Sequence, residues 1–225
     1  MTRRSPVLRV PVALALAVLA TAGCASMAGR PPVTPDPTTE PRMSQAPDTF
    51  RVKFETSEGD FVVESIREWA PHGVDRFHQL VEDGFYDDTR FFRVLYGFVA
   101  QFGISGDPAE NQRWRSNPIP DDEGAVSNER GTVTFAMAGP ETRTTQLFVN
   151  LVDNRRLDGM GFAPIGRVVE GMETVDALHS GYGEGAPRGR GPDQGRIQSE
   201  GNAYLDRDYP RLTRLERATI VEPAP

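Results

Sequence analysis

The chain has 225 residues, of which 38% are hydrophobic and 25% are charged. This composition and a mean hydropathy of −0.45 are typical of a soluble globular protein and exclude a polytopic membrane protein. The length suits one domain with appendages. A net charge of −7 gives a surface that binds nucleic acid poorly, so we expect no nucleic-acid partner.

The amino terminus has the pattern of an export signal. Arginines precede an apolar run over residues 10–20, which is too short to span a bilayer. The TAGC that ends at Cys24 resembles the processing box of bacterial lipoproteins, in which the cysteine is lipidated and becomes the new amino terminus. Its threonine departs from the leucine that is commoner there. We expect a signal peptide over residues 1–23 and a lipid anchor at Cys24 that holds the protein to a membrane.

That anchor would place the protein in a bacterial cell envelope, facing the periplasm or the exterior. An ordinary secretory signal with an incidental cysteine is the alternative. Cys24 is the only cysteine, so the chain has no internal disulfide. Residues 24–47 are rich in proline and threonine and are predicted to form a semi-extended tether. The folded domain is predicted over residues 48–222.

Within that domain, short apolar alternations separated by turn residues predict strands. Helical spacing of apolar residues predicts a helix over 71–83, which ends at Gly84, and another over 172–180, which ends at Gly181. The predicted strands are 50–54, 61–66, 91–94, 98–101, 132–135, 147–151, 165–168 and 218–221.

About eight short strands with two helices predict a mainly β fold, a closed antiparallel barrel capped at its ends by the helices. The last strand is expected to return and pair with the opening hairpin. Two long segments, 104–130 and 181–205, show no clear pattern and are predicted to be irregular.

Two motifs contain most of the functional information. Residues 91–101 read FFRVLYGFVAQ, and residues 135–150 read FAMAGPETRTTQLFVN. Each predicts a pair of half-buried strands, and Arg93 stands where the alternation would otherwise bury it. Together they closely resemble the signature segments of the cyclophilin-type peptidyl-prolyl cis-trans isomerases. The barrel is also the architecture of that family, so motif and predicted fold agree.

The resemblance implies a role for each matching residue. Arg93 lies at the position of the catalytic arginine and Gln101 at the position of the glutamine that orients it. The substrate-binding groove is implied to contain the proline-pocket residues Phe98, Val99, Phe148 and Leu157, the peptide-binding strand residues Ala136 and Met137, and Phe162 in place of a second groove histidine.

This reaction needs no cofactor, metal or nucleophile. It needs an apolar pocket for the proline ring and a donor for the prolyl nitrogen. The histidines, His72, His78 and His179, lack metal-ligand spacing, so no metal site is expected. The GISGD at residues 103–107 lacks the last glycine of a nucleophile elbow, which argues against a hydrolase.

Several positions depart from the family pattern. Phe92 replaces a histidine, Ile104 replaces the aspartate of a GGD, and Arg156 replaces the groove tryptophan. These changes keep the central chemistry and alter the rim of the groove. We therefore expect a peptidyl-prolyl isomerase that binds proline-containing segments and assists folding of envelope proteins. The alternatives are a proline-peptide-binding chaperone or assembly module without catalysis, and a structural protein that uses the barrel as a scaffold.

Overall fold

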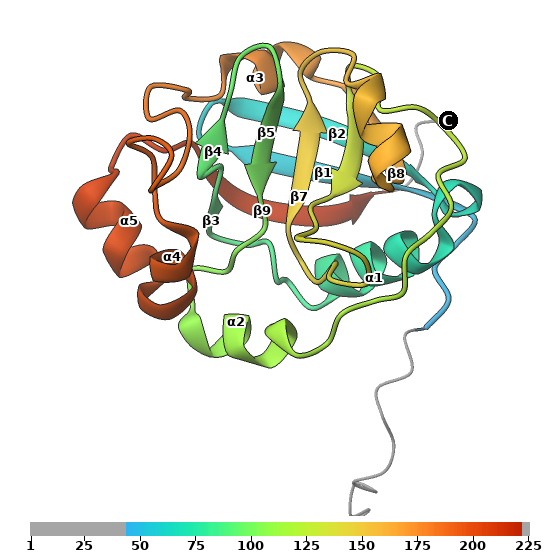
Figure 1. Cartoon of the computed structure of the whole chain (residues 1–225), viewed down its shortest axis with the longest axis horizontal. Coiled ribbons are helices and arrows are strands. Elements are labelled where there is room, and N and C mark those ends of the chain that lie inside the picture. The colour runs from blue at the N-terminus through green and yellow to red at the C-terminus, as the bar shows by residue number, and fades with distance from the viewer. Residues whose placement is uncertain (1–43, 222–225) are drawn as a thin grey trace, which may run out of the picture. The chain divides into compact units, whose positions relative to one another are not determined.

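The computed structural model describes residues 44–221 (Figure 1). The predicted signal peptide, Cys24 and most of the predicted tether lie outside these residues. The strands are Thr49–Thr56 (β1), Gly59–Ile66 (β2), Thr89–Arg90 (β3), Arg93–Val94 (β4), Val99–Phe102 (β5), Thr132–Phe135 (β6), Leu147–Asn150 (β7), Pro164–Glu170 (β8) and Arg214–Val221 (β9). The helices are Pro71–Glu82 (α1), Pro108–Arg115 (α2), Met172–Ala177 (α3), Gln194–Glu200 (α4) and Asn202–Asp208 (α5), with 3-10 helices Arg67–Trp69 (η1) and Arg155–Met160 (η2).

The strands form one antiparallel sheet in the order β3-β9-β1-β2-β8-β6-β7-β5-β4. Its outer strands β3 and β4 are separated along the chain by Phe91 and Phe92 alone, so the sheet curls until its two edges meet. The mainly β, antiparallel, barrel-like fold is therefore confirmed. Among residues 44–221 the chain itself bridges the two edges, and no ladder of backbone hydrogen bonds joins them.

The opening hairpin shows why the interior of the sheet is apolar. Phe50, Val52 and Phe54 alternate with more exposed residues in β1, so one face of the strand turns inward. Phe54 lies directly opposite Phe61 of β2, and their rings stack with centroids 4.8 Å apart. The register of the hairpin is thus set by a buried aromatic pair. As predicted, β9 returns to pair with β1.

Helix α1 lies at one end of the curled sheet and α3 at the other (Figure 1). In α1 the apolar residues at helical spacing, including Val74, Phe77 and Leu80, are fully buried. Gly84, with φ of +67°, follows the helix in a conformation that suits glycine. The predicted second helix is three residues too long, because Leu178 has the extended ψ of 137° and ends α3 after Ala177.

The prediction of only two helices was wrong, because α2, α4 and α5 lie in the segments 104–130 and 181–205 that were predicted to be irregular. All three helices are short and mostly polar on the surface, so their sequences lack a strong helical pattern. The side chains of Asp107 and Asp193 cap α2 and α4 by accepting backbone N–H groups. No helix within residues 44–221 is long and apolar enough to cross a membrane.

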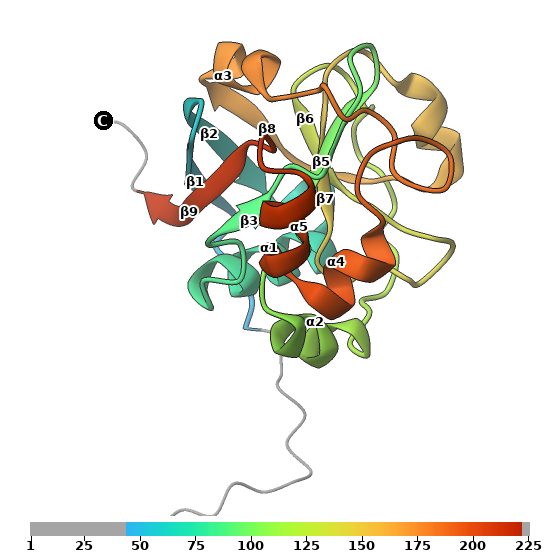
Figure 2. The same ribbon diagram turned by 90° about the vertical axis from the view of Figure 1, so that its left-hand side faces the viewer.

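Helices α4 and α5 lie against the barrel beside β3 and β9 (Figure 2). Between these two helices and the barrel is a second, smaller apolar core, formed by Phe92, Ile104, Ile197, Tyr204, Leu205 and Leu212. We call residues 181–208, which carry both helices, the C-terminal insertion. Phe92 and Ile104 are two of the positions that depart from the family pattern, and the structure shows their apolar side chains packed beneath this insertion.

Candidate functional site

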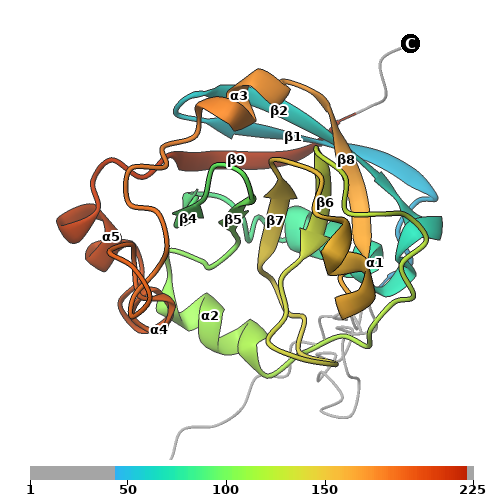
Figure 3. The same ribbon diagram turned by 45° about the horizontal axis from the view of Figure 1, so that its top comes forward.

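The register of three neighbouring strands builds one wall of the site. Arg93 of β4 lies directly opposite Gln101 of β5, and Gln101 lies directly opposite Phe148 of β7. Residues that are paired across antiparallel strands point to the same face of the sheet. The three side chains therefore form a row across β4, β5 and β7, which lie side by side in Figure 3.

Hydrogen bonds fix the polar part of this row. Arg93 Nη1 donates to Gln101 Oε1 over 3.2 Å, and Gln101 Nε2 donates to Gln146 Oε1 over 2.9 Å. Because Gln146 holds the amide nitrogen, the carbonyl oxygen of Gln101 is turned toward the guanidinium. Gln101 is therefore hydrogen-bonded to Arg93, and the role of orienting Arg93, which the resemblance implied, stays a prediction.

Beside this row is a pocket of about 320 Å³. Its walls contain all nine residues to which the sequence analysis assigned catalysis or substrate binding, which are Arg93, Gln101, Phe98, Val99, Ala136, Met137, Phe148, Leu157 and Phe162. The structure therefore brings together residues from segments that are far apart in the sequence. Their individual catalytic and binding roles stay predictions.

The floor of the pocket is apolar. Val99, Phe148 and Leu157 are buried in one cluster, and Phe162 contacts Phe148 edge to face with ring centroids 5.7 Å apart. Phe98 and Ala136 pack against the same cluster. A surface of this kind accepts a compact apolar ring, and Arg93 places a cationic donor at its edge.

The 3-10 helix η2 brings Leu157 to the pocket, and Asp158 holds that helix in place. The carboxylate of Asp158 accepts hydrogen bonds from the Ser127 hydroxyl and from the backbone N–H and side chain of Asn128. Desolvation raises the pKa of Asp158, but these hydrogen bonds outweigh it and lower the pKa below its ordinary value. The ionised carboxylate thus fastens residues 157–159, which have the sequence LDG, to the loop before β6.

Arginines also approach the rim. The Arg156 guanidinium lies over the Phe98 ring, 4.7 Å from its centroid, and the Arg93 guanidinium lies 5.6 Å from the same centroid. Both distances are within the range of cation–π attraction. Arg156 therefore lies at the mouth of the groove, next to a residue of the pocket wall.

The sequence analysis missed three residues at the site. Met160 and Arg188 line the pocket, and Glu184 contacts Arg93 from the C-terminal insertion. Hydrogen bonds from Arg93 lower the pKa of Glu184 below its ordinary value, although burial opposes the shift. Met160 comes three residues after Leu157, which the resemblance placed in the groove, whereas Arg188 and Glu184 lie in a stretch predicted to be irregular, where no local pattern indicated them.

The side chains of the pocket indicate what the site can do chemically. Within residues 44–221, no three side chains of histidine, cysteine, aspartate or glutamate form a group that could hold a metal ion. What the pocket itself offers is an oriented guanidinium, a neighbouring amide and an apolar floor. Such a site can bind an extended apolar ligand and stabilise a change of conformation through hydrogen bonds.

Two comparisons with known sequences give the same family. The family model "Cyclophilin type peptidyl-prolyl cis-trans isomerase/CLD" matches residues 51–199, which is more than half of the chain. The chain is similar to peptidyl-prolyl cis-trans isomerase B of Escherichia coli, with 35% identity over 136 residues that cover 56% of this chain and 82% of the relative. It is also similar to the isomerase cyp18 of Streptomyces antibioticus, with 35% identity over 147 residues that cover 61% and 87% of the two chains.

The fold has solved counterparts. A cyclophilin-type isomerase of Cryptosporidium parvum superposes with a TM-score of 0.59 at 19% identity, covering 78% of this chain and 99% of that one. The same protein has been crystallised in the presence of the dipeptide Ala-Pro. The curled antiparallel sheet, the row of Arg93 and Gln101 and the sequence similarity agree. The chain belongs to the cyclophilin-type peptidyl-prolyl cis-trans isomerase family.

Proposed function

We propose that this chain catalyses the cis–trans isomerisation of X–Pro bonds in extended or unfolded segments of other proteins. The observation that carries the proposal is the position of Arg93, whose guanidinium forms part of the wall of an otherwise largely apolar pocket. The pocket supplies a place for a proline ring, and Arg93 supplies a hydrogen-bond donor beside it.

Isomerisation of an X–Pro bond needs little more than such a pocket and such a donor. Rotation about an X–Pro bond has a barrier of roughly 18–20 kcal/mol because the amide has partial double-bond character, and the uncatalysed exchange takes tens of seconds. A donor that hydrogen-bonds the prolyl nitrogen draws its lone pair out of conjugation and lowers this barrier. Each 1.36 kcal/mol removed from it speeds the exchange about tenfold.

The orientation of Arg93 favours catalysis over binding alone. A groove that only binds proline segments needs the apolar floor of Val99, Phe148 and Leu157, but it does not need a guanidinium held in one direction. Here Gln101 and Gln146 fix that direction through consecutive hydrogen bonds. A donor that is oriented in advance costs no reorganisation when the amide twists.

We also propose that the isomerase acts on proteins of a bacterial cell envelope and is held there by lipid at Cys24. This proposal rests on the sequence before the described domain: the basic and apolar residues of 1–23, the TAGC that ends at Cys24, and the proline-rich residues up to 47. A tether of that length would let the groove reach segments at some distance from the membrane surface.

Replacement of Arg93 by alanine tests the catalytic proposal. We expect kcat/KM to fall about 10²- to 10³-fold, because removal of one preorganised donor has an effect of this size in other enzymes. The measurement is NMR exchange of a short X–Pro peptide with and without the protein. Arg217→Ala removes an exposed arginine of β9 and is the matched control, which should keep its activity. If the wild-type protein binds the peptide without accelerating its cis–trans exchange, the alternative of a proline-peptide-binding module without catalysis would be supported instead.

Replacement of Cys24 by alanine tests the anchor. Stable attachment needs more than one acyl chain, and all of them depend on this cysteine in a lipoprotein. We expect the variant to leave the membrane fraction or to accumulate unprocessed, whereas Ser26→Ala should fractionate like the wild type. The measurement is cell fractionation together with incorporation of labelled fatty acid. Unlabelled wild-type protein in the soluble fraction would rule out the anchor.

The charged rim gives a third prediction, for the family's cyclic peptide inhibitor cyclosporin. By the resemblance, Arg156 takes the place of the groove tryptophan. Its side chain is exposed and lies over Phe98, so it must lose water to cover a ligand. A buried interface tryptophan contributes roughly 2–3 kcal/mol, so we expect affinity about one to two orders of magnitude weaker than a tryptophan would give.

Calorimetric titration of the wild type and of Arg156→Trp measures this difference. The variant should bind cyclosporin more tightly. Arg155→Trp makes the same chemical change one residue earlier, at a side chain that pairs with Glu129, and should bind like the wild type. Tight binding by the wild type, or equal gains in both variants, would show that Arg156 does not set the affinity.

A further inference from the structure

Glu184 forms a two-point ion pair with Arg93. Its Oε1 accepts from Arg93 Nε over 2.6 Å, and its Oε2 accepts from Nη2 over 2.7 Å. The two residues are 91 positions apart, and the segment that carries Glu184 passes beside β4 (Figures 1 and 3). A bidentate pair of this geometry fixes both the position and the plane of a guanidinium.

Glu184 and Gln101 hold the guanidinium at different nitrogens. Glu184 takes Nε and Nη2, while Gln101 takes Nη1, so all three nitrogens of Arg93 have a partner. An arginine has five N–H groups, and these bonds use three of them. Among residues 44–221, one N–H on each terminal nitrogen has no partner and is left for a ligand in the groove.

Glu184 does not fill the groove. The pocket beside Arg93 is open, and its walls include Arg93 and Arg188 but not Glu184. The carboxylate therefore holds the guanidinium from outside the pocket. This placement distinguishes a residue that positions Arg93 from one that competes with a substrate for the space in front of it.

The backbone around Glu184 is itself fixed. Its carbonyl oxygen accepts from the N–H of Gly191 over 2.8 Å, and its carboxylate also accepts from the N–H of Gly185 over 3.0 Å. A Cβ at Gly189 would lie only 2.2 Å from the Glu184 carbonyl oxygen, so the close turn requires glycine there. The loop thus presents the carboxylate in one place.

The C-terminal insertion that carries this loop is seated on the barrel by an apolar core. Phe92, which directly precedes Arg93, is 1% exposed and lies in the same core as Tyr204 and Leu205 of α5. Ile104 joins this core shortly after β5. Two departures from the family pattern, at Phe92 and Ile104, therefore flank the strands of Arg93 and Gln101 and support the insertion that supplies Glu184.

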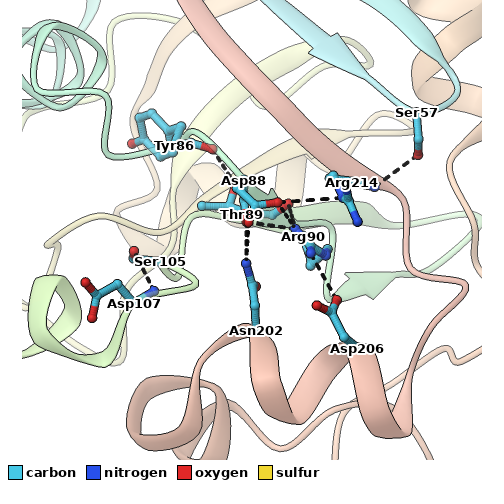
Figure 4. Close-up of polar contacts among 10 residues, drawn as sticks. All are labelled: Ser57, Tyr86, Asp88, Thr89, Arg90, Ser105, Asp107, Asn202, Asp206 and Arg214. Carbon is cyan, nitrogen blue, oxygen red and sulfur yellow. Dashed lines mark hydrogen bonds and ion pairs between the residues drawn. The ribbon is translucent and has the colours of Figure 1, made fainter.

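Polar contacts fasten the same insertion to the edge of the sheet (Figure 4). Asn202 at the start of α5 donates to the carbonyl and carboxylate oxygens of Asp88 over 2.8 and 3.0 Å. Arg90 of β3 pairs with Asp206 of α5 over 3.0 Å. These bonds and the apolar core hold α5 against β3, the strand that continues into β4 and Arg93.

We propose that Glu184 is a positioning residue of the isomerase site, which together with Gln101 holds Arg93 at the groove. This inference rests on the proposed isomerase function. A free arginine side chain samples many rotamers, and the ion pair removes that freedom before a substrate arrives. The carboxylate also offsets part of the positive charge of Arg93. The ion pair therefore fixes the orientation of the guanidinium but weakens its electrostatic attraction for the substrate.

Glu184→Ala and Glu184→Gln test this role. Loss of a hydrogen-bonded ion pair should lower kcat of peptide exchange by about ten- to a hundredfold, with KM changed by less than about threefold, because the donor acts mainly in the transition state. Glu200→Gln breaks an ion pair with Arg196 elsewhere on the insertion and is the matched control. Thermal unfolding followed by circular dichroism shows whether each variant keeps its fold.

A second readout does not depend on activity. In protein labelled with ¹⁵N-arginine, the Nε–H of Arg93 should exchange slowly with water in the wild type and in Glu200→Gln, and quickly in both Glu184 variants. Unchanged exchange and unchanged kcat in folded Glu184 variants would overturn the inference, and so would a higher kcat, which would make Glu184 a competitor. If the wild type has no activity although Arg93 is protected, the proposed function fails and the positioning of Arg93 stands.

Discussion

The site depends on one constraint, the register in which β4, β5 and β7 pair. Because Arg93, Gln101 and Phe148 lie opposite one another across these strands, the proposed catalytic donor, the amide that hydrogen-bonds to it and the floor of the pocket share one face. A slip of one residue in any of the strands would turn its side chains to the opposite face. The rings of Phe54, Phe61 and Phe102, buried inside the curled sheet, resist such a slip from within.

The polar groups of the site are ordered by hydrogen-bond partners, of which Gln101 lies in the pocket wall and Gln146, Glu184 and Asp158 do not line that pocket. Gln146 turns Gln101, Gln101 and Glu184 hold Arg93, and Asp158 fastens the helix that brings Leu157. Each of these partners leaves the pocket itself open. The C-terminal insertion contributes to this support, so a segment that lies beside the barrel affects the geometry of its groove.

Much of the fold could be predicted because its signals are local. The alternation in β1 and β2, the helical spacing in α1 and the two signature motifs each report on their own segment. Seven of the nine site residues lie in those motifs, and the other two, Leu157 and Phe162, lie shortly after the second one. Helices α2, α4 and α5 could not be predicted in the same way, because they have eight residues or fewer and are stabilised by contacts with one another and with the barrel.

The site residues that could not be predicted from the sequence also depend on long-range contacts. Glu184 reaches Arg93, and Arg188 reaches the pocket wall, only because the insertion folds back toward β4. Nothing near these two residues in the sequence indicates the contact. Phe92 and Ile104 could be recognised as departures from the family pattern, but only the structure shows that their side chains pack in the second core. The positions of these residues therefore depend on packing between segments that are distant in the sequence, which local sequence patterns do not reveal.

The central claim is that the pocket beside Arg93 receives the proline of an X–Pro segment. A crystal structure of this protein with an Ala-Pro peptide tests it most directly. We expect the proline ring to lie on Phe98, Phe148 and Leu157, with a free N–H of Arg93 within hydrogen-bond distance of the prolyl amide. A peptide bound elsewhere, or with its proline ring turned away from this floor, would show that the pocket does not receive the proline.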